Sequence, residues 1–245
     1  MFSFSKALLP LTFALSVLAT CPLSDVKVVG NSLPPQESAT LFLTLGVGTQ
    51  NYTCSDAGNY TAAGAVAVIF DISCDYKDKI HELPKLATDA FDTWNNFQGS
   101  EGKVHSIKGG TVRLASRTAF FGADGEVCSA LKKDFSSVTN SILGEHFFIP
   151  NPTGSPGTSP RWDFTQSQNN PNAFVTVARK ASIAAPTGKQ DIDWLDLTNI
   201  EGELAFEVYR TDTRSGQPPA KCEPGSAPIA VKYSSIYWFT QNKSK

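Results

Sequence analysis

Apolar and polar residues alternate in short runs along most of this chain, a pattern typical of β-strands. One run places Leu43, Leu45 and Val47 on one face, and the run from Ala65 to Cys74 is apolar over its first part, as in a strand buried on both sides. Further strand-like runs lie at 111–121, 173–182, 202–213 and 229–241. Turn-forming pairs such as Gly109-Gly110 and Pro218-Pro219 separate them. The pattern predicts a mainly β fold, an antiparallel β-sandwich or barrel.

Within 204–209, apolar Leu204, Phe206 and Val208 alternate with a second set that contains Glu207. This is the pattern of a strand in a sheet with one solvent-exposed face. Gly46 and Gly48 follow the first apolar run, and we expect a turn there, with a surface segment after it.

Two segments have a helical period and predict one or two short helices packed on the sheets. After Pro84, a residue favoured in a first helical turn, one face collects apolar residues. They are Leu86, Ala87, Ala90, Phe91 and Trp94. The second segment runs from Cys128 to Gly144, with Leu131, Phe135, Val138 and Ile142 at helical spacing.

The segment 150–172 is rich in Pro, Gly, Ser and Asn and predicts a long loop. It contains Trp162, which has no periodic apolar partner nearby, so we expect the ring to be exposed. The β-rich core then covers about 41–239.

The N-terminus has the pattern of a secretory signal peptide. Lys6 precedes an uncharged apolar stretch that is shorter than the roughly 20 residues of a membrane span and contains Pro10. Cleavage after Ala19 predicts a signal peptide over 1–19 and a single β-rich domain over 20–245, secreted to the extracellular space with no membrane span. The alternative is a bacterial lipoprotein with a lipid on Cys21, but Thr20 fits that signal poorly.

The sequence also contains sites for the covalent modifications that are typical of secreted proteins. Sequons for N-glycosylation begin at Asn51, Asn59 and Asn242. The chain has five cysteines, which predict structural disulfides with one cysteine left over and leave the pairing open. They are Cys21, Cys54, Cys74, Cys128 and Cys222.

Several functional classes are disfavoured by composition and spacing. The chain has 21 basic and 23 acidic residues and no clustered basic segment, which argues against a nucleic-acid partner. Histidines and cysteines lack the spacing of a metal site, so no metal is expected. A dinucleotide fingerprint would need glycine at position 51, which is Asn51, and a helix after Gly48, so no cofactor is expected either.

Three residues are candidates for ligand binding. They are His146 beside a pair of phenylalanines, Trp162 in the predicted loop, and Trp194. Exposed aromatic rings stack on sugars, so the expected partner is an extracellular carbohydrate, a cell-wall component or a host surface. Acidic residues around Trp194 leave a glycoside hydrolase as the alternative, because such enzymes use two carboxylates. These acids are Asp191, Asp193, Asp196, Glu201 and Glu203.

A series of ordered motifs resembles a family of small secreted fungal and bacterial proteins, domain-of-unknown-function family 3455. The motifs are GVGTQNYTC, AVAVIFDISC, LGEHFF, DWLDL, EVYRTDTRSGQPPAKC and VKYSSIYWF, spread over Leu41 to Phe239. Members are often labelled malate dehydrogenase, a label that the failed fingerprint and the signal peptide do not support. The family commonly has Gly-His-His-Tyr-Phe where this chain has Glu145 before His146, so it lacks half of that histidine pair. The resemblance implies no catalytic residues.

We expect a secreted, glycosylated binding protein more than an enzyme.

Overall fold

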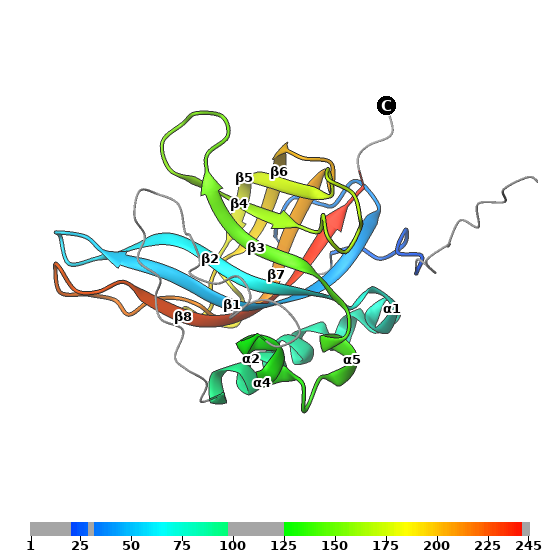
Figure 1. Ribbon diagram of the computed structural model, residues 1–245, viewed down its shortest axis with the longest axis horizontal. Helices are drawn as coiled ribbons and strands as arrows, with labels where there is room; N and C mark the ends of the chain where they lie inside the picture. Colours follow the sequence, from blue (N-terminus) through cyan, green and yellow to red (C-terminus); the bar gives the residue numbers. More distant parts are fainter. Residues whose placement is uncertain (1–20, 29–31, 98–124, 242–245) are drawn as a thin grey trace, which may run out of the picture.

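Eight antiparallel strands close into a barrel in the computed structural model of this chain, which describes residues 21–28, 32–97 and 125–241 (Figure 1). Each strand pairs with its neighbour in the chain, and the last pairs with the first. The strands are β1 (Thr40–Cys54), β2 (Tyr60–Asp71), β3 (Ile142–Pro150), β4 (Thr158–Asp163), β5 (Phe174–Ile183), β6 (Trp194–Glu201), β7 (Glu207–Ser215) and β8 (Ile229–Thr240). The predicted antiparallel β class is confirmed, and the architecture is the barrel, not the sandwich. Closure leaves no unpaired edge strand in the barrel.

The longest strands, β1, β2 and β8, lie side by side and extend beyond the rest of the barrel (Figure 1). Gly46 and Gly48 lie in the middle of β1 and pair on both sides, so the turn expected there is wrong. Glycine is needed at position 46 because a Cβ atom would lie 2.4 Å from the ring of Tyr237. These glycines therefore make room for strand neighbours and for a ring inside the barrel.

Short helices pack on the outside of the barrel, below β1 and β8 in Figure 1. They are α1 (Ser73–Tyr76), η1 (Ile80–Glu82), α2 (Leu83–Asn96), α4 (Glu126–Leu131) and α5 (Ser136–Thr139). Helix α2 confirms the first helical prediction, with Leu86, Ala87, Ala90 and Trp94 buried. None of the helices in the described ranges is long and apolar enough to cross a membrane.

The second helical prediction is partly wrong. The segment 128–144 holds the end of α4, all of α5 and the start of β3. Gly144, expected to end a helix, instead pairs with Ile69 of β2. Strand pairing with a distant part of the chain outweighs the local helical period there.

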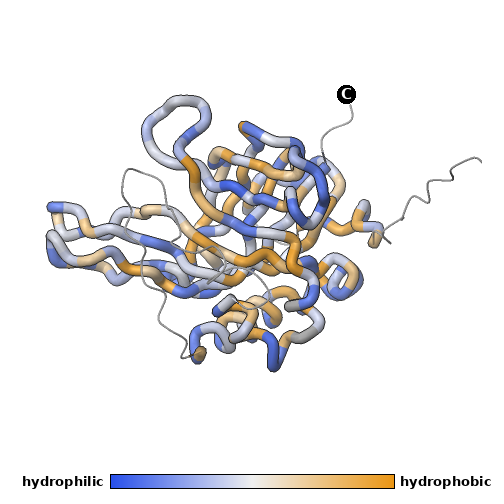
Figure 2. The backbone as a smooth tube through the Cα atoms, in the orientation of Figure 1, coloured by the Kyte–Doolittle hydropathy of each residue, from blue (hydrophilic) through white to orange (hydrophobic). Residues whose placement is uncertain are grey.

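Two apolar clusters lie on opposite faces of the strands. One joins Leu43, Leu45 and Val47 of β1 to the buried face of α2 and is therefore outside the barrel. The other contains alternate residues such as Ile69, Val175 and Tyr237 and lies on the inner face of the strands. Figure 2 shows apolar residues concentrated where the long strands pass over the helices.

The solvent-exposed face expected for the segment 204–209 is wrong. Glu207 and Tyr209 are buried as well as Val208.

The predicted long loop 150–172 contains a strand. β4 (Thr158–Asp163) lies between β3 and β5 and carries Trp162 into the barrel wall. The predicted strand at 111–121 and the signal peptide over 1–19 lie outside the described residues.

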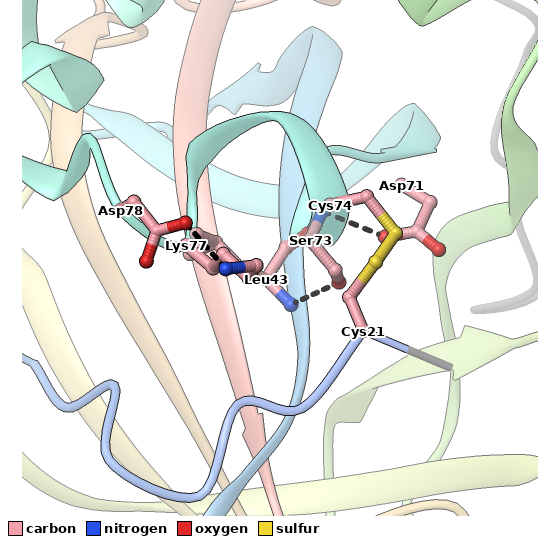
Figure 3. The surroundings of a disulfide bond; sticks show 7 residues. All are labelled: Cys21, Leu43, Asp71, Ser73, Cys74, Lys77 and Asp78. Carbon is pink, nitrogen blue, oxygen red and sulfur yellow. Dashed lines mark hydrogen bonds and ion pairs between the residues drawn. A yellow bond between two sulfur atoms is a disulfide. The ribbon is translucent and has the colours of Figure 1, made fainter. Parts of the chain in front are cut away.

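Disulfides join Cys21 to Cys74 and Cys54 to Cys222, and Cys128 is buried as a thiol. Figure 3 shows the first bridge, which ties the N-terminal segment to α1. Next to it, the Ser73 hydroxyl accepts a hydrogen bond of 3.1 Å from the backbone N–H of Leu43 in β1. The bridge therefore anchors the N-terminal segment to the barrel.

Candidate functional site

His146 and Trp162 stack on each other inside the barrel. They are direct partners on β3 and β4, with ring centroids 4.1 Å apart and planes 13° from parallel. His146 also pairs with Ala67, a member of the interior cluster, which places both rings on the inner face. The exposed position expected for Trp162 is wrong, because its relative exposure is 1%.

Trp194, the third candidate from the sequence, lies elsewhere. It begins β6 and is a buried member of the outer cluster, with the residues that face the helices. Its strand neighbour Leu195 packs on the interior cluster, as the alternation of side chains requires. The structure thus brings together two of the three predicted residues and separates the third.

Two tyrosines of β8, which are not among the three residues predicted from the sequence, lie beside the His146 and Trp162 rings. The Tyr237 ring lies 5.2 Å from that of Trp162 and 5.9 Å from that of His146. Its hydroxyl is 3.0 Å from the hydroxyl of Tyr233. Burial raises the pKa of Tyr233 well above its usual 10, so this hydroxyl remains neutral. The sequence signal was the alternation of Tyr233, Ser235, Tyr237 and Phe239, which places them on one face.

His146 is a neutral ring in this setting. Burial lowers its pKa from 6.5 to about 3, and the nearby Arg210 charge acts in the same direction. Its Nδ1 lies 2.9 Å from the backbone carbonyl oxygen of Arg161, so Nδ1 carries the proton and donates it. Nε2 is then an acceptor. The bond to a backbone oxygen fixes the ring and does not make it a base for a neighbouring nucleophile.

Arg210 brings a positive charge to the same interior. It pairs with Leu195 on one side and Tyr237 on the other, both in or against the interior cluster. Its Nε and Nη2 donate to the backbone oxygen of Asp193 at 3.0 and 2.8 Å. The charge also reaches Tyr52, whose pKa burial raises to about 12 while Arg210 acts in the opposite direction.

Two buried polar atoms on interior residues have no hydrogen-bond partner among the described residues. They are Trp162 Nε1 and Ser235 Oγ. Ser235 pairs with Gly46 and lies between Tyr233 and Tyr237 on the inner face of β8. A buried polar group without a partner costs roughly 1–3 kcal/mol, so such groups are normally matched by a water molecule or a ligand.

The interior is apolar at one end and polar at the other. Phe42, Phe164 and Phe239 pack ring against ring at 5.1–6.4 Å where β1 begins and β8 ends. Further along β1 and β8, Gln50, Tyr233 and Ser235 supply polar groups.

The acidic residues around Trp194 do not gather in one place. Asp196 lies buried on the outer face, 3.2 Å from Lys180, which also pairs with Glu207. Glu201 is 4.0 Å from Arg161, and Asp191 bonds the backbone N–H of Ser215. Within the described residues, no group of three or more possible metal ligands occurs.

The fold and interior define a class, the eight-stranded up-and-down β-barrel with an aromatic and polar interior. Barrels of this size are just wide enough to be filled by side chains or to hold one small ligand. The chain belongs to the family described as a protein of unknown function (DUF3455), whose sequence profile matches residues 34–241. No curated protein matches the chain. No solved structure matches it either.

Proposed function

We propose that this protein is a secreted, non-catalytic binding protein that holds one small aromatic molecule inside its barrel. The observation that carries the proposal is the pair of buried polar atoms without partners on the inner face, Trp162 Nε1 and Ser235 Oγ. They lie beside the His146–Trp162–Tyr237 rings, so a flat ligand would find stacking surface and hydrogen-bond partners together.

The extracellular setting is supported by two disulfides, which form and persist in oxidising compartments. The predicted signal peptide and sequons add to this support. A small ligand is favoured over a polysaccharide because Trp162 and Trp194 are both buried and give no exposed platform for sugar chains. The hydrolase alternative has no observation in its favour, since the acids near Trp194 have separate partners.

Binding of 2-naphthol, which is neutral at pH 7, tests the proposal. Isothermal titration calorimetry should show saturable binding by the secreted protein, and the ligand should raise Tm. Trp162→Phe should weaken binding roughly threefold to tenfold, because it removes the unpartnered N–H and part of the stacking surface. Trp194→Phe is the matched control, a buried tryptophan on the outer face, and should bind like the parent.

Two results would overturn the proposal. No saturable binding of 2-naphthol would mean that water molecules satisfy the interior polar atoms. Equal loss in Trp162→Phe and Trp194→Phe would mean that binding does not involve the interior wall.

A further inference from the structure

Arg210 differs from the other arginines in the described residues. Arg161 lies 3.7 Å from the ring centre of Phe174 and pairs with Glu201. Arg214 donates to Thr88 and to the Pro84 carbonyl of α2, on the outer face. Arg179 is exposed to solvent. The strand register places both Arg210 and Arg179 on the inner face, since they pair with Tyr237 and Leu197 of the interior cluster. Arg210 is the one whose charge acts on the pKa values of His146 and Tyr233.

The Arg210 charge is not balanced by a carboxylate. Its hydrogen bonds run to a backbone oxygen, and it forms no ion pair with any residue that the structure describes. His146 and Tyr233, two interior groups on which the Arg210 charge acts, do not balance it, since burial lowers the pKa of His146 and raises that of Tyr233 and so keeps both side chains neutral. A half-buried charge without a counter-charge is unfavourable, and a bound anion would relieve that cost.

The guanidinium geometry also selects the ligand. Arginine presents donors in a planar fork that matches a carboxylate, and such charge-assisted bonds are about twice as strong as neutral ones. With Nε and Nη2 turned to the Asp193 oxygen, Nη1 remains as a donor. The aromatic rings lie beside it through Tyr237, its strand partner.

We infer that the ligand class of the barrel is an aromatic carboxylate, with its ring against the His146–Trp162–Tyr237 wall and its carboxylate on Arg210. This inference rests on the proposed function, because it names the ligand of the same interior site. It adds a specificity-determining residue that a merely apolar barrel would not need.

The test compares 2-naphthoate with 2-naphthol, which share a ring system and differ in charge at pH 7. The parent protein should bind the carboxylate about tenfold tighter or more, since a hydrogen bond to a charged group is worth about that factor. Arg210→Gln should lose this preference and bind 2-naphthol as the parent does. Arg210→Lys keeps the positive charge and should keep part of the preference for the carboxylate. Arg214→Gln removes a positive charge from the outer face of the same strand and is the matched control.

The outcomes separate the two proposals. Equal binding of 2-naphthol and 2-naphthoate by the parent would overturn the carboxylate inference and leave the binding function standing. Binding of neither would overturn the proposed function itself. A loss of preference in Arg214→Gln equal to that in Arg210→Gln would assign the effect to net charge and reject the role of Arg210. If Arg210→Gln fails to fold, the carboxylate inference is still tested by the ratio of the affinities for 2-naphthoate and 2-naphthol, measured in the parent and in Arg210→Lys.

Discussion

His146 and Trp162 meet ring to ring inside the barrel, as direct partners on two strands joined by the segment 151–157. The imidazole is held by its Nδ1 bond to the Arg161 carbonyl oxygen and remains neutral. It therefore acts as a flat, polarisable part of the interior, with Nε2 as its acceptor nitrogen.

The buried imidazole should make stability depend on pH. The pKa of His146 is about 3 in the folded protein against 6.5 for a free side chain, so between these values the unfolded chain binds more protons. The free energy of unfolding should therefore fall as pH decreases below about 6, with His146 contributing up to about 1.4 kcal/mol per pH unit. Urea unfolding at pH 7, 5 and 4 measures it. His146→Gln should lose this share of the slope, while His81→Gln, at an exposed histidine, should keep it. Identical slopes in His146→Gln and the parent would contradict the prediction.

Lys180 should be needed to stabilise the charges of Asp196 and Glu207 on the outer face. Burial raises the pKa of Asp196, and Lys180 opposes that rise. Lys180→Gln should lower the free energy of unfolding at pH 7 by about 1–3 kcal/mol, because it leaves a buried carboxylate without its counter-charge. The loss should shrink in acid, since a protonated Asp196 no longer needs a cation. Chemical unfolding at pH 7 and pH 4 measures both effects, with Lys180→Arg as control. A loss that is the same at both pH values would show that it does not come from charge.

The two disulfides should differ in their contribution to stability. Cys54–Cys222 spans 168 residues and Cys21–Cys74 spans 53, and the longer loop restricts the unfolded chain more. Replacing either pair by serine should cost roughly 2–5 kcal/mol, with the greater loss for the Cys54/Cys222 pair. Urea midpoints of the two double variants compare them directly. A greater loss for the Cys21/Cys74 pair would mean that its anchoring of the N-terminal segment outweighs loop length.

Glycosylation should occur at Asn59 and not at Asn51. Asn59 is exposed in the turn between β1 and β2, where its Oδ1 accepts a bond of 2.8 Å from Lys221. Asn51 lies within β1, paired on both sides, and its Oδ1 accepts a bond from the Thr49 hydroxyl. A glycan needs an exposed loop position. Mass spectrometry of protein secreted from a eukaryotic host should show a glycan lost in Asn59→Gln and kept in Asn51→Gln. The reverse pattern would refute the assignment, and Asn242 lies outside the described residues.

Local patterns predicted the parts of the fold that depend on local physics. The period of two correctly located β8, and the amphipathic face after Pro84 correctly located α2. The odd number of cysteines correctly implied that one would stay out of the bridges, which is Cys128. Failures occurred where a distant partner decides the conformation. Gly144 joins β3 because Ile69 pairs with it, and Trp162 is buried because β4 inserts between β3 and β5.

The candidate site was visible in the sequence only as two separate residues. His146 and Trp162 stood out by type and context, yet nothing local indicated that they stack. Arg210 and Tyr237 were not selected, because each looks like an ordinary member of its strand until the register pairs them. The alternation of β8 could have placed Tyr233, Ser235 and Tyr237 on one face, but not on the inner one.

The sequence by itself determined a β-rich chain, one amphipathic helix and a cysteine count that leaves one thiol. The strands and the helix follow from residue periodicity, which depends on neighbouring positions. The single thiol follows from the odd number of cysteines in the chain. Only the tertiary structure decided that β8 returns to β1 and closes a barrel, that Leu43 faces the helices, and that Arg210 faces the interior. The physical reason is that a strand shows two alternating faces, and which one is inside depends on pairing with segments far away in the chain.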